Sequence, residues 1–191
     1  CAIDPTEAHL QTVKGWSHLW AGEAPLARQH LEAALQLNPY NQSRLVEVAK
    51  AFMYLDDLDG AADLLERCRA LTPFATEAPH EEQGLLFLLR SEFDLAAEQL
   101  ALVRRHHPED RAGTELAIMS ELYALLVAAG ANSKDALPRF RHWQESMARR
   151  WCGADALDNQ RLRRWAVDHN PFQEESRREW FEELIDLAMS E

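Results

Sequence analysis

The sequence predicts an all-α protein built from about five antiparallel helical hairpins. Three observations support this fold class. A pattern of small and apolar residues that ends in a proline occurs three times between Gly15 and Pro108. Apolar residues elsewhere recur at the three- and four-residue spacing of amphipathic helices. No segment shows the alternation and β-branched composition typical of a strand.

The three copies of the pattern have nearly equal lengths. The first copy consists of Gly15, Ala27, Leu31, Ala34 and Pro39. The second consists of Ala49, Ala61, Leu65, Cys68 and Pro73, each 34 positions after its counterpart. The third consists of Gly84, Ala96, Leu100, Val103 and Pro108, each 35 positions further on. Small residues at Gly15 and Ala27 permit close backbone approach, so we expect paired helices to touch there and to bury Leu31 and Ala34.

This period, with small residues and a closing proline at fixed places, resembles the tetratricopeptide repeat family over residues 8–108. The resemblance implies a right-handed solenoid in which the first helix of each repeat lines a concave groove. Two positions depart from the family pattern, since the large aromatic residue often found early in the first helix is Gln11 in the first copy and His80 in the third.

Turn and capping residues predict the helix ends. Helices are expected over 6–21, 25–37, 42–55 and 58–71, with Thr6 capping the first. After the third copy, further helices are expected over 115–129, 133–153 and 155–169. Asn170 is the expected N-cap of the last helix, with Pro171 at its first position and Gln173 as its capping-box partner. The domains are thus a lead over 1–5, three repeats over 6–108, and degenerate hairpins over 109–191 that end in a capping helix. Alternatively, that last helix binds a partner.

The charge distribution narrows the classes of partner. The net charge of −12 argues against binding to nucleic acid, whose phosphates require Lys and Arg. One basic region stands out, because residues 139–164 contain seven Arg and three acidic residues, or 7 − 3 = +4. This region could bind an acidic partner or lipid headgroups, or it could be the polar face of two helices.

No arrangement of residues predicts catalysis, a metal site or a cofactor. The eight histidines form no zinc-protease pair on one helix. The pair His106 and His107 lies where a helix is expected to end, and there the helix dipole favours histidine. Adjacent acidic pairs, such as Glu81 with Glu82 and Glu174 with Glu175, diverge on a helix and are expected on solvated faces. An enzyme with its site after Pro108 remains a third class of function.

The family resemblance also identifies candidate binding residues, those at the groove-facing repeat positions. In the first copy these are Thr12, Trp16, Leu19 and Trp20; in the second Val46, Lys50, Met53 and Tyr54; in the third Glu81, Leu85, Leu88 and Leu89. Aromatic residues and Met are enriched in protein interfaces. From this set Thr12, Trp16, Leu19, Trp20, Lys50, Met53, Tyr54 and Leu85 are the predicted contacts of a peptide or protein segment. Alternatively, these side chains pack against neighbouring helices.

Two details refine this binding hypothesis. Some family members clamp a C-terminal carboxylate with Lys and Asn, but Thr12 and Trp16 stand where that clamp begins. A receptor for chaperone tails is therefore not expected. Lys50, the single cation of the strip, could instead meet a carboxylate of the partner.

The three cysteines are too few and too dispersed for a disulfide framework or a zinc motif. Cys68 is expected to be buried as a small apolar residue, and Cys152 to be incidental. A chain that begins with Cys1 resembles a bacterial lipoprotein, in which that residue carries lipid. The leading expectation is then a non-catalytic adaptor of the cell envelope, at the periplasmic face of the outer membrane, that assists assembly of a pilus, secretion or outer-membrane complex. The alternative is a cytosolic tetratricopeptide chaperone or regulator.

Overall fold

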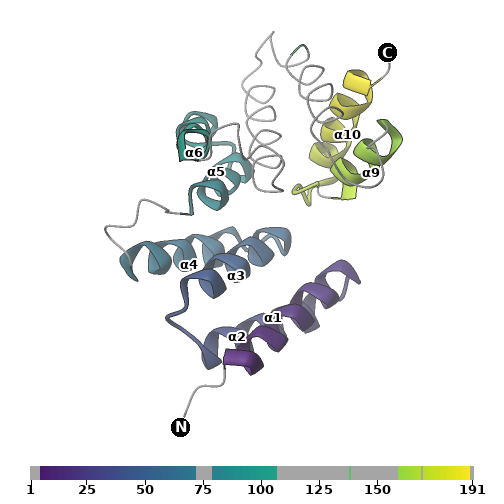
Figure 1. Ribbon diagram of the computed structural model, residues 1–191. Helices are drawn as coiled ribbons and strands as arrows, with labels where there is room; N and C mark the ends of the chain where they lie inside the picture. The colour runs from purple at the N-terminus through teal and green to yellow at the C-terminus, as the bar shows by residue number, and fades with distance from the viewer. Residues whose placement is uncertain (1–4, 72–78, 107–137, 139–158, 169, 190–191) are drawn as a thin grey trace. The chain divides into compact units, whose positions relative to one another are not determined.

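The computed structural model of the protein describes residues 5–71, 79–106, 138, 159–168 and 170–189, and every regular element in these residues is an α-helix (Figure 1). The chain divides into an N-terminal unit, Cys1–Leu86, and a C-terminal unit, Phe87–Glu191. The helices are α1 (Pro5–Trp20), α2 (Ala24–Leu37), α3 (Gln42–Tyr54), α4 (Leu58–Leu71), α5 (His80–Leu89), α6 (Phe93–His106), α9 (Asn159–Asp168) and α10 (Glu175–Met189). The all-α prediction is confirmed for the described residues.

Helices α1 and α2 form a closely packed pair. Gly15 is buried at their contact, and a Cβ atom added there would lie 2.6 Å from Cγ of Leu31 and 3.3 Å from the carbonyl oxygen of Ala27. Leu31 and Ala34 are fully buried. Because any side chain at position 15 would overlap Leu31, the expected role of the small residues is confirmed.

Helices α3 and α4 form a second pair in which the same pattern is buried. Ala49, Ala61, Leu65 and Cys68 are all buried, as predicted. Burial also raises the pKa of the Cys68 thiol. Helix α3 contacts α1 and α2 in addition to α4, which makes it the helix shared by the two pairs. In the third copy, Ala96, Leu100 and Val103 on α6 are buried as well.

The turn between the paired helices has the same backbone geometry in all three copies. Its central residue adopts a left-handed conformation, with φ of 75° at Gly22, 60° at Asp56 and 61° at Ser91. The next residue donates its N–H to the carbonyl five positions earlier, at 2.9 Å in each case: Glu23 to His18, Asp57 to Phe52, and Glu92 to Phe87. This is the Schellman motif. The turn residues lie 34 and 35 positions apart, so the structure repeats with the period of the sequence.

Only Gly22 among these turn residues lacks a Cβ atom, so the other two positions carry a backbone penalty. Ser91→Gly should raise the free energy of unfolding by about 1 kcal/mol, and Asp56→Gly by less because Asp tolerates this conformation better. Gly22→Ala should lower it by about 1 kcal/mol, purely through the backbone, since no atom lies within 4 Å of the added Cβ. Urea unfolding measures all three. A loss of stability in Ser91→Gly would contradict the assigned turn geometry.

A side-chain cluster joins the two helical pairs of the N-terminal unit. Nη1 of Arg28 on α2 lies 2.6 Å from Oδ2 of Asp57, which precedes α4. The other carboxylate oxygen of Asp57 accepts the N–H of Gly60 at 2.9 Å and so caps α4. The Arg28 guanidinium holds the pKa of Asp57 below its ordinary value, and the Gly60 N–H acts in the same direction. Arg28 also lies 4.9 Å from the ring centroid of Phe52.

In the C-terminal unit, ion pairs and hydrogen bonds hold α10 in place. Arg163 on α9 forms a bidentate pair with Asp186 on α10. Arg177 on α10 donates to the carbonyl oxygens of Leu89, at 2.9 Å, and Leu88, at 3.3 Å. These carbonyls end α5, so a cation from α10 caps α5 and complements its dipole.

Helix ends agree closely with prediction between residues 24 and 71, but two predicted caps are wrong. Helix α1 begins at Pro5, so Thr6 lies inside its first turn. Helix α10 begins at Glu175 instead of Pro171. The reason is local, because Oδ1 of Asn170 accepts the N–H of Phe172 at 3.0 Å, two residues on, and makes a turn that buries Phe172. Gln173 is exposed there and forms no capping box.

Several predictions lie outside the described residues. They include the lipid on Cys1, the helix over 115–129, Cys152, the domain boundary after residue 108 and most of the arginine-rich region. The structure leaves these as predictions.

Candidate functional site in the N-terminal unit

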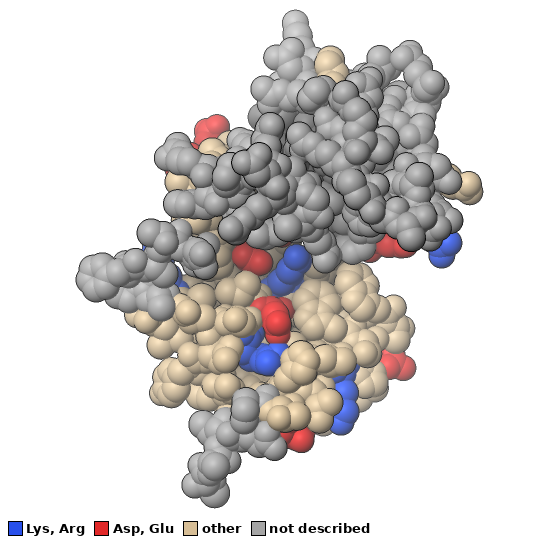
Figure 2. All heavy atoms as spheres, in the orientation of Figure 1, with Lys and Arg blue, Asp and Glu red and all other residues tan. Residues whose placement is uncertain are grey.

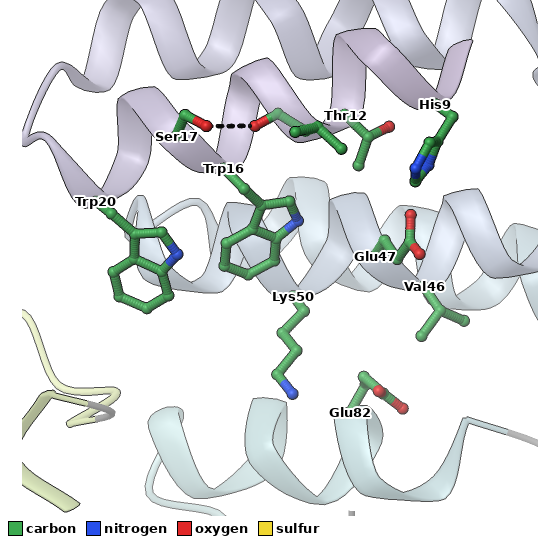
Figure 3. A pocket seen from close by; sticks show the side chains of 10 residues that line it. His9, Thr12, Trp16, Ser17, Trp20, Val46, Glu47, Lys50 and Glu82 are labelled. Carbon is green, nitrogen blue, oxygen red and sulfur yellow. Dashed lines mark hydrogen bonds between the residues drawn. The ribbon is translucent and has the colours of Figure 1, made fainter. Parts of the chain in front are cut away.

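A pocket of about 440 Å³ lies within the N-terminal unit, mainly between α1 and α3 (Figure 3). Ten residues line it: His9, Thr12, Val13, Trp16, Ser17 and Trp20 from α1, Val46, Glu47 and Lys50 from α3, and Glu82 from α5. The α1 residues occupy one ridge at helical spacing, opposite the face that Gly15 packs against α2. The α1–α2 contact therefore directs this ridge toward α3.

One side of the pocket is aromatic. The ring centroids of Trp16 and Trp20 lie 5.7 Å apart in a stacked arrangement. Tyr54 on α3 meets both rings edge to face, at 6.0 Å from Trp16 and 5.6 Å from Trp20. Tyr54 is only 7% exposed, whereas Trp20 is 56% exposed. A buried ring thus holds an exposed indole in a fixed position at the edge of the pocket.

The other side of the pocket is charged. Nζ of Lys50 lies 3.6 Å from Oε1 of Glu81, and Nη1 of Arg44 lies 2.6 Å from Oε2 of Glu47. Figure 3 shows Lys50 extending from α3 toward α5, with the Glu82 side chain beside it. Figure 2 shows acidic and basic side chains adjoining one another within a largely uncharged face over α1 to α4. The expectation that Glu81 and Glu82 lie on a solvated face is wrong, because Glu81 is 4% exposed and Glu82 lines the pocket.

Burial raises the pKa of Glu82 above its ordinary value of 4.5, and the charge of Lys50 only partly opposes this shift. As pH rises, this carboxyl therefore ionises in the unfolded chain before it ionises in the folded one. The contribution of Glu82 to the free energy of unfolding falls between pH 4.5 and the raised pKa. Glu82→Gln cannot ionise and should be more stable than wild type above that window, with no difference below pH 4. Chemical unfolding across pH 3–8 tests this, with Glu98→Gln on the exposed surface of α6 as the control. A variant less stable than wild type at pH 7 would contradict the assigned burial.

The structure distributes the predicted binding residues between the pocket and the core. Thr12, Trp16, Trp20 and Lys50 line the pocket, although the Thr12 hydroxyl is buried and donates to the carbonyl of Ala8 at 3.1 Å. The remaining predicted residues do not line it. Leu19 is half-buried, Met53 and Leu85 are fully buried, and Tyr54 supports the two indoles from behind.

Val46 also lines the pocket, as its groove-facing repeat position implied, although it was not among the predicted contacts. Five further lining residues were not predicted at all: His9, Val13, Ser17, Glu47 and Glu82. A signal for three of them is present in the sequence. His9, Val13 and Ser17 follow one another at intervals of four residues, beside the predicted Trp16 and Trp20. Glu47 and Glu82 carry no comparable signal, since charged residues on a helix are usually solvated.

The described part of the chain lacks the features of a metal site and of a membrane-spanning helix. No group of three or more His, Cys, Asp or Glu residues there could hold a metal ion. None of the described helices is both long and apolar enough to cross a bilayer. Comparison of the chain with known family models, curated proteins and solved structures finds no match.

Proposed function

We propose that residues 6–108 form a tetratricopeptide-like right-handed solenoid, and that the protein is a non-catalytic scaffold that binds a peptide or protein segment. Support for the repeat comes from three sets of buried small residues and three turns with the same geometry. Both recur 34 positions later in the second copy and a further 35 positions later in the third. Stacked repeats of this kind create extended surfaces suited to binding other chains.

The observation that carries the proposed binding is the pocket with its exposed indole. Trp20 is 56% exposed although two aromatic neighbours fix its ring. An exposed, positioned aromatic ring beside a pocket is typical of the anchors that dominate interface energetics. The pocket volume of about 440 Å³ suits one or two side chains of a bound segment. The partner is therefore expected to insert side chains between α1 and α3.

Trp20→Ala should weaken binding about thirtyfold or more. An aromatic anchor that a partner buries typically costs about 2 kcal/mol or more of binding free energy when it is cut to Ala. Random 12-residue peptides selected on the full chain supply the ligand, and titration gives Kd. The melting temperature should change little, since the ring is exposed in the free protein. Tyr54→Ala should lower both stability and affinity, because that ring is buried.

The matched control is Tyr40→Ala, which removes an aromatic side chain that is 76% exposed and lies outside the pocket. It should leave both Kd and the melting temperature unchanged. Selected peptides that bind Trp20→Ala as tightly as wild type would place the binding surface elsewhere.

A further inference from the structure

The charged groups in and beside the pocket do not balance. When all three carboxyls are ionised, Glu47, Glu81 and Glu82 contribute three negative charges, and Arg44 and Lys50 contribute two positive charges. The sum over these five groups is 2 − 3 = −1. Among the described residues, the ionised site therefore carries one uncompensated negative charge.

Among these described groups, Glu82 is the one without an ion pair. The Arg44 guanidinium pairs with Glu47, and the Lys50 ammonium pairs with Glu81. Within the described part of the chain, the Glu82 carboxylate accepts no hydrogen bond from another side chain and has no ion-pair partner within 4.0 Å. A partly buried carboxylate without a partner is costly, and a cation from a ligand would remove that cost.

The aromatic side of the same pocket also favours a cation. The faces of indole rings carry negative electrostatic potential and attract ammonium and guanidinium groups, with tryptophan the strongest of the aromatic side chains. Trp16, Trp20 and Glu82 all line the pocket. The sequence suggested that Lys50 meets a carboxylate of the partner, but the Lys50 ammonium already forms an ion pair with Glu81 at 3.6 Å.

We propose that this pocket selects a positively charged side chain, arginine or lysine, on the bound segment. The cation contacts the indole faces and pairs with the Glu82 carboxylate, while Lys50 and Glu81 neutralise each other. This inference rests on the proposed binding function and specifies its ligand. The net charge of −12 acts in the same direction, because an acidic surface attracts basic partners.

Matched peptides test the selection on the full chain. The selected 12-residue peptides are synthesised in sets that differ at one position, which carries arginine, its neutral analogue citrulline, or glutamate. Wild type should bind the arginine peptide about three- to thirtyfold more tightly than the citrulline peptide, the range that a cation–π contact covers. Glutamate should bind most weakly.

Two variants separate the pocket from the general charge of the protein. Glu82→Gln and Trp20→Leu should each reduce the ratio of the arginine and citrulline affinities, because each removes one of the two contacts of the cation. Glu98→Gln removes the same charge outside the pocket and should leave the ratio unchanged. Circular dichroism confirms that each variant folds.

The outcomes distinguish this inference from the proposed function. Peptides that bind in the pocket with equal affinity for all three side chains, or with a preference for glutamate, overturn the inference and leave the binding function intact. The same holds if Glu82→Gln and Glu98→Gln change the ratio equally, because long-range attraction alone then explains it. Failure of any peptide to bind the pocket overturns both.

Discussion

Leu31→Ala is expected to lower the free energy of unfolding by about 2–5 kcal/mol, the range for buried Leu truncated to Ala. Leu31 is fully buried and fills the space above Gly15, where α1 and α2 approach each other closely. Urea unfolding of the full chain measures the loss. Leu26→Ala on the same helix is the control, because Leu26 is exposed and its truncation should cost less than about 1 kcal/mol.

Gly15→Ala tests the same contact from the other helix. Alanine favours the helix by about 1 kcal/mol relative to glycine, but its methyl would overlap Leu31, and overpacking costs about 1–3 kcal/mol. The two changes should not be additive. In the double variant the new methyl occupies part of the space that Leu31 leaves, so the loss should be smaller than the sum of the single losses. Additivity within about 0.5 kcal/mol would contradict the contact.

Phe181→Ala is expected to cost about 3–5 kcal/mol, the range for a fully buried aromatic side chain. Phe181 lies on α10 among the buried side chains of the C-terminal unit, which include Phe172 and Ile185. Chemical unfolding followed by far-UV circular dichroism measures the loss. Leu95→Ala, at an exposed position of the same unit, should change stability by less than about 1 kcal/mol. A cost below 1 kcal/mol for Phe181→Ala would mean that α10 is not part of a packed core.

The buried pattern of the fold could be predicted from the sequence because small residues constrain helix packing strongly. Where helix axes approach closely, small residues such as Gly, Ala and Cys fit best, so these residues indicate the contact. The left-handed turn was harder to predict from the sequence, because only Gly22 of the three turn residues is a glycine, the residue that favours this conformation. Asp56 and Ser91 adopt the conformation because the helices around them require it. Asn170 misled the prediction, since its side chain caps a turn as readily as a helix.

The candidate site could be predicted only in part. Trp16, Trp20 and Lys50 line the pocket, but Met53 and Leu85 are buried. Helical periodicity shows which residues of one helix share a face. It does not show which of these faces a neighbouring helix covers. Glu82 was missed for the same reason. An acidic residue beside another on a helix is usually solvated, and only the folded structure shows that Glu82 lines a pocket.

The most direct test of the proposed binding site uses the six tryptophans of the chain. Two of them, Trp16 and Trp20, line the pocket, and the other four are Trp143, Trp151, Trp165 and Trp180. Each indole N–H gives a separate NMR signal, assigned by single Trp→Phe variants. During titration with a selected peptide, the signals of Trp16 and Trp20 should shift together and saturate with one Kd. Unchanged signals from these two, with shifts confined to Trp143 and Trp151, would place binding in the arginine-rich region and contradict the proposed site.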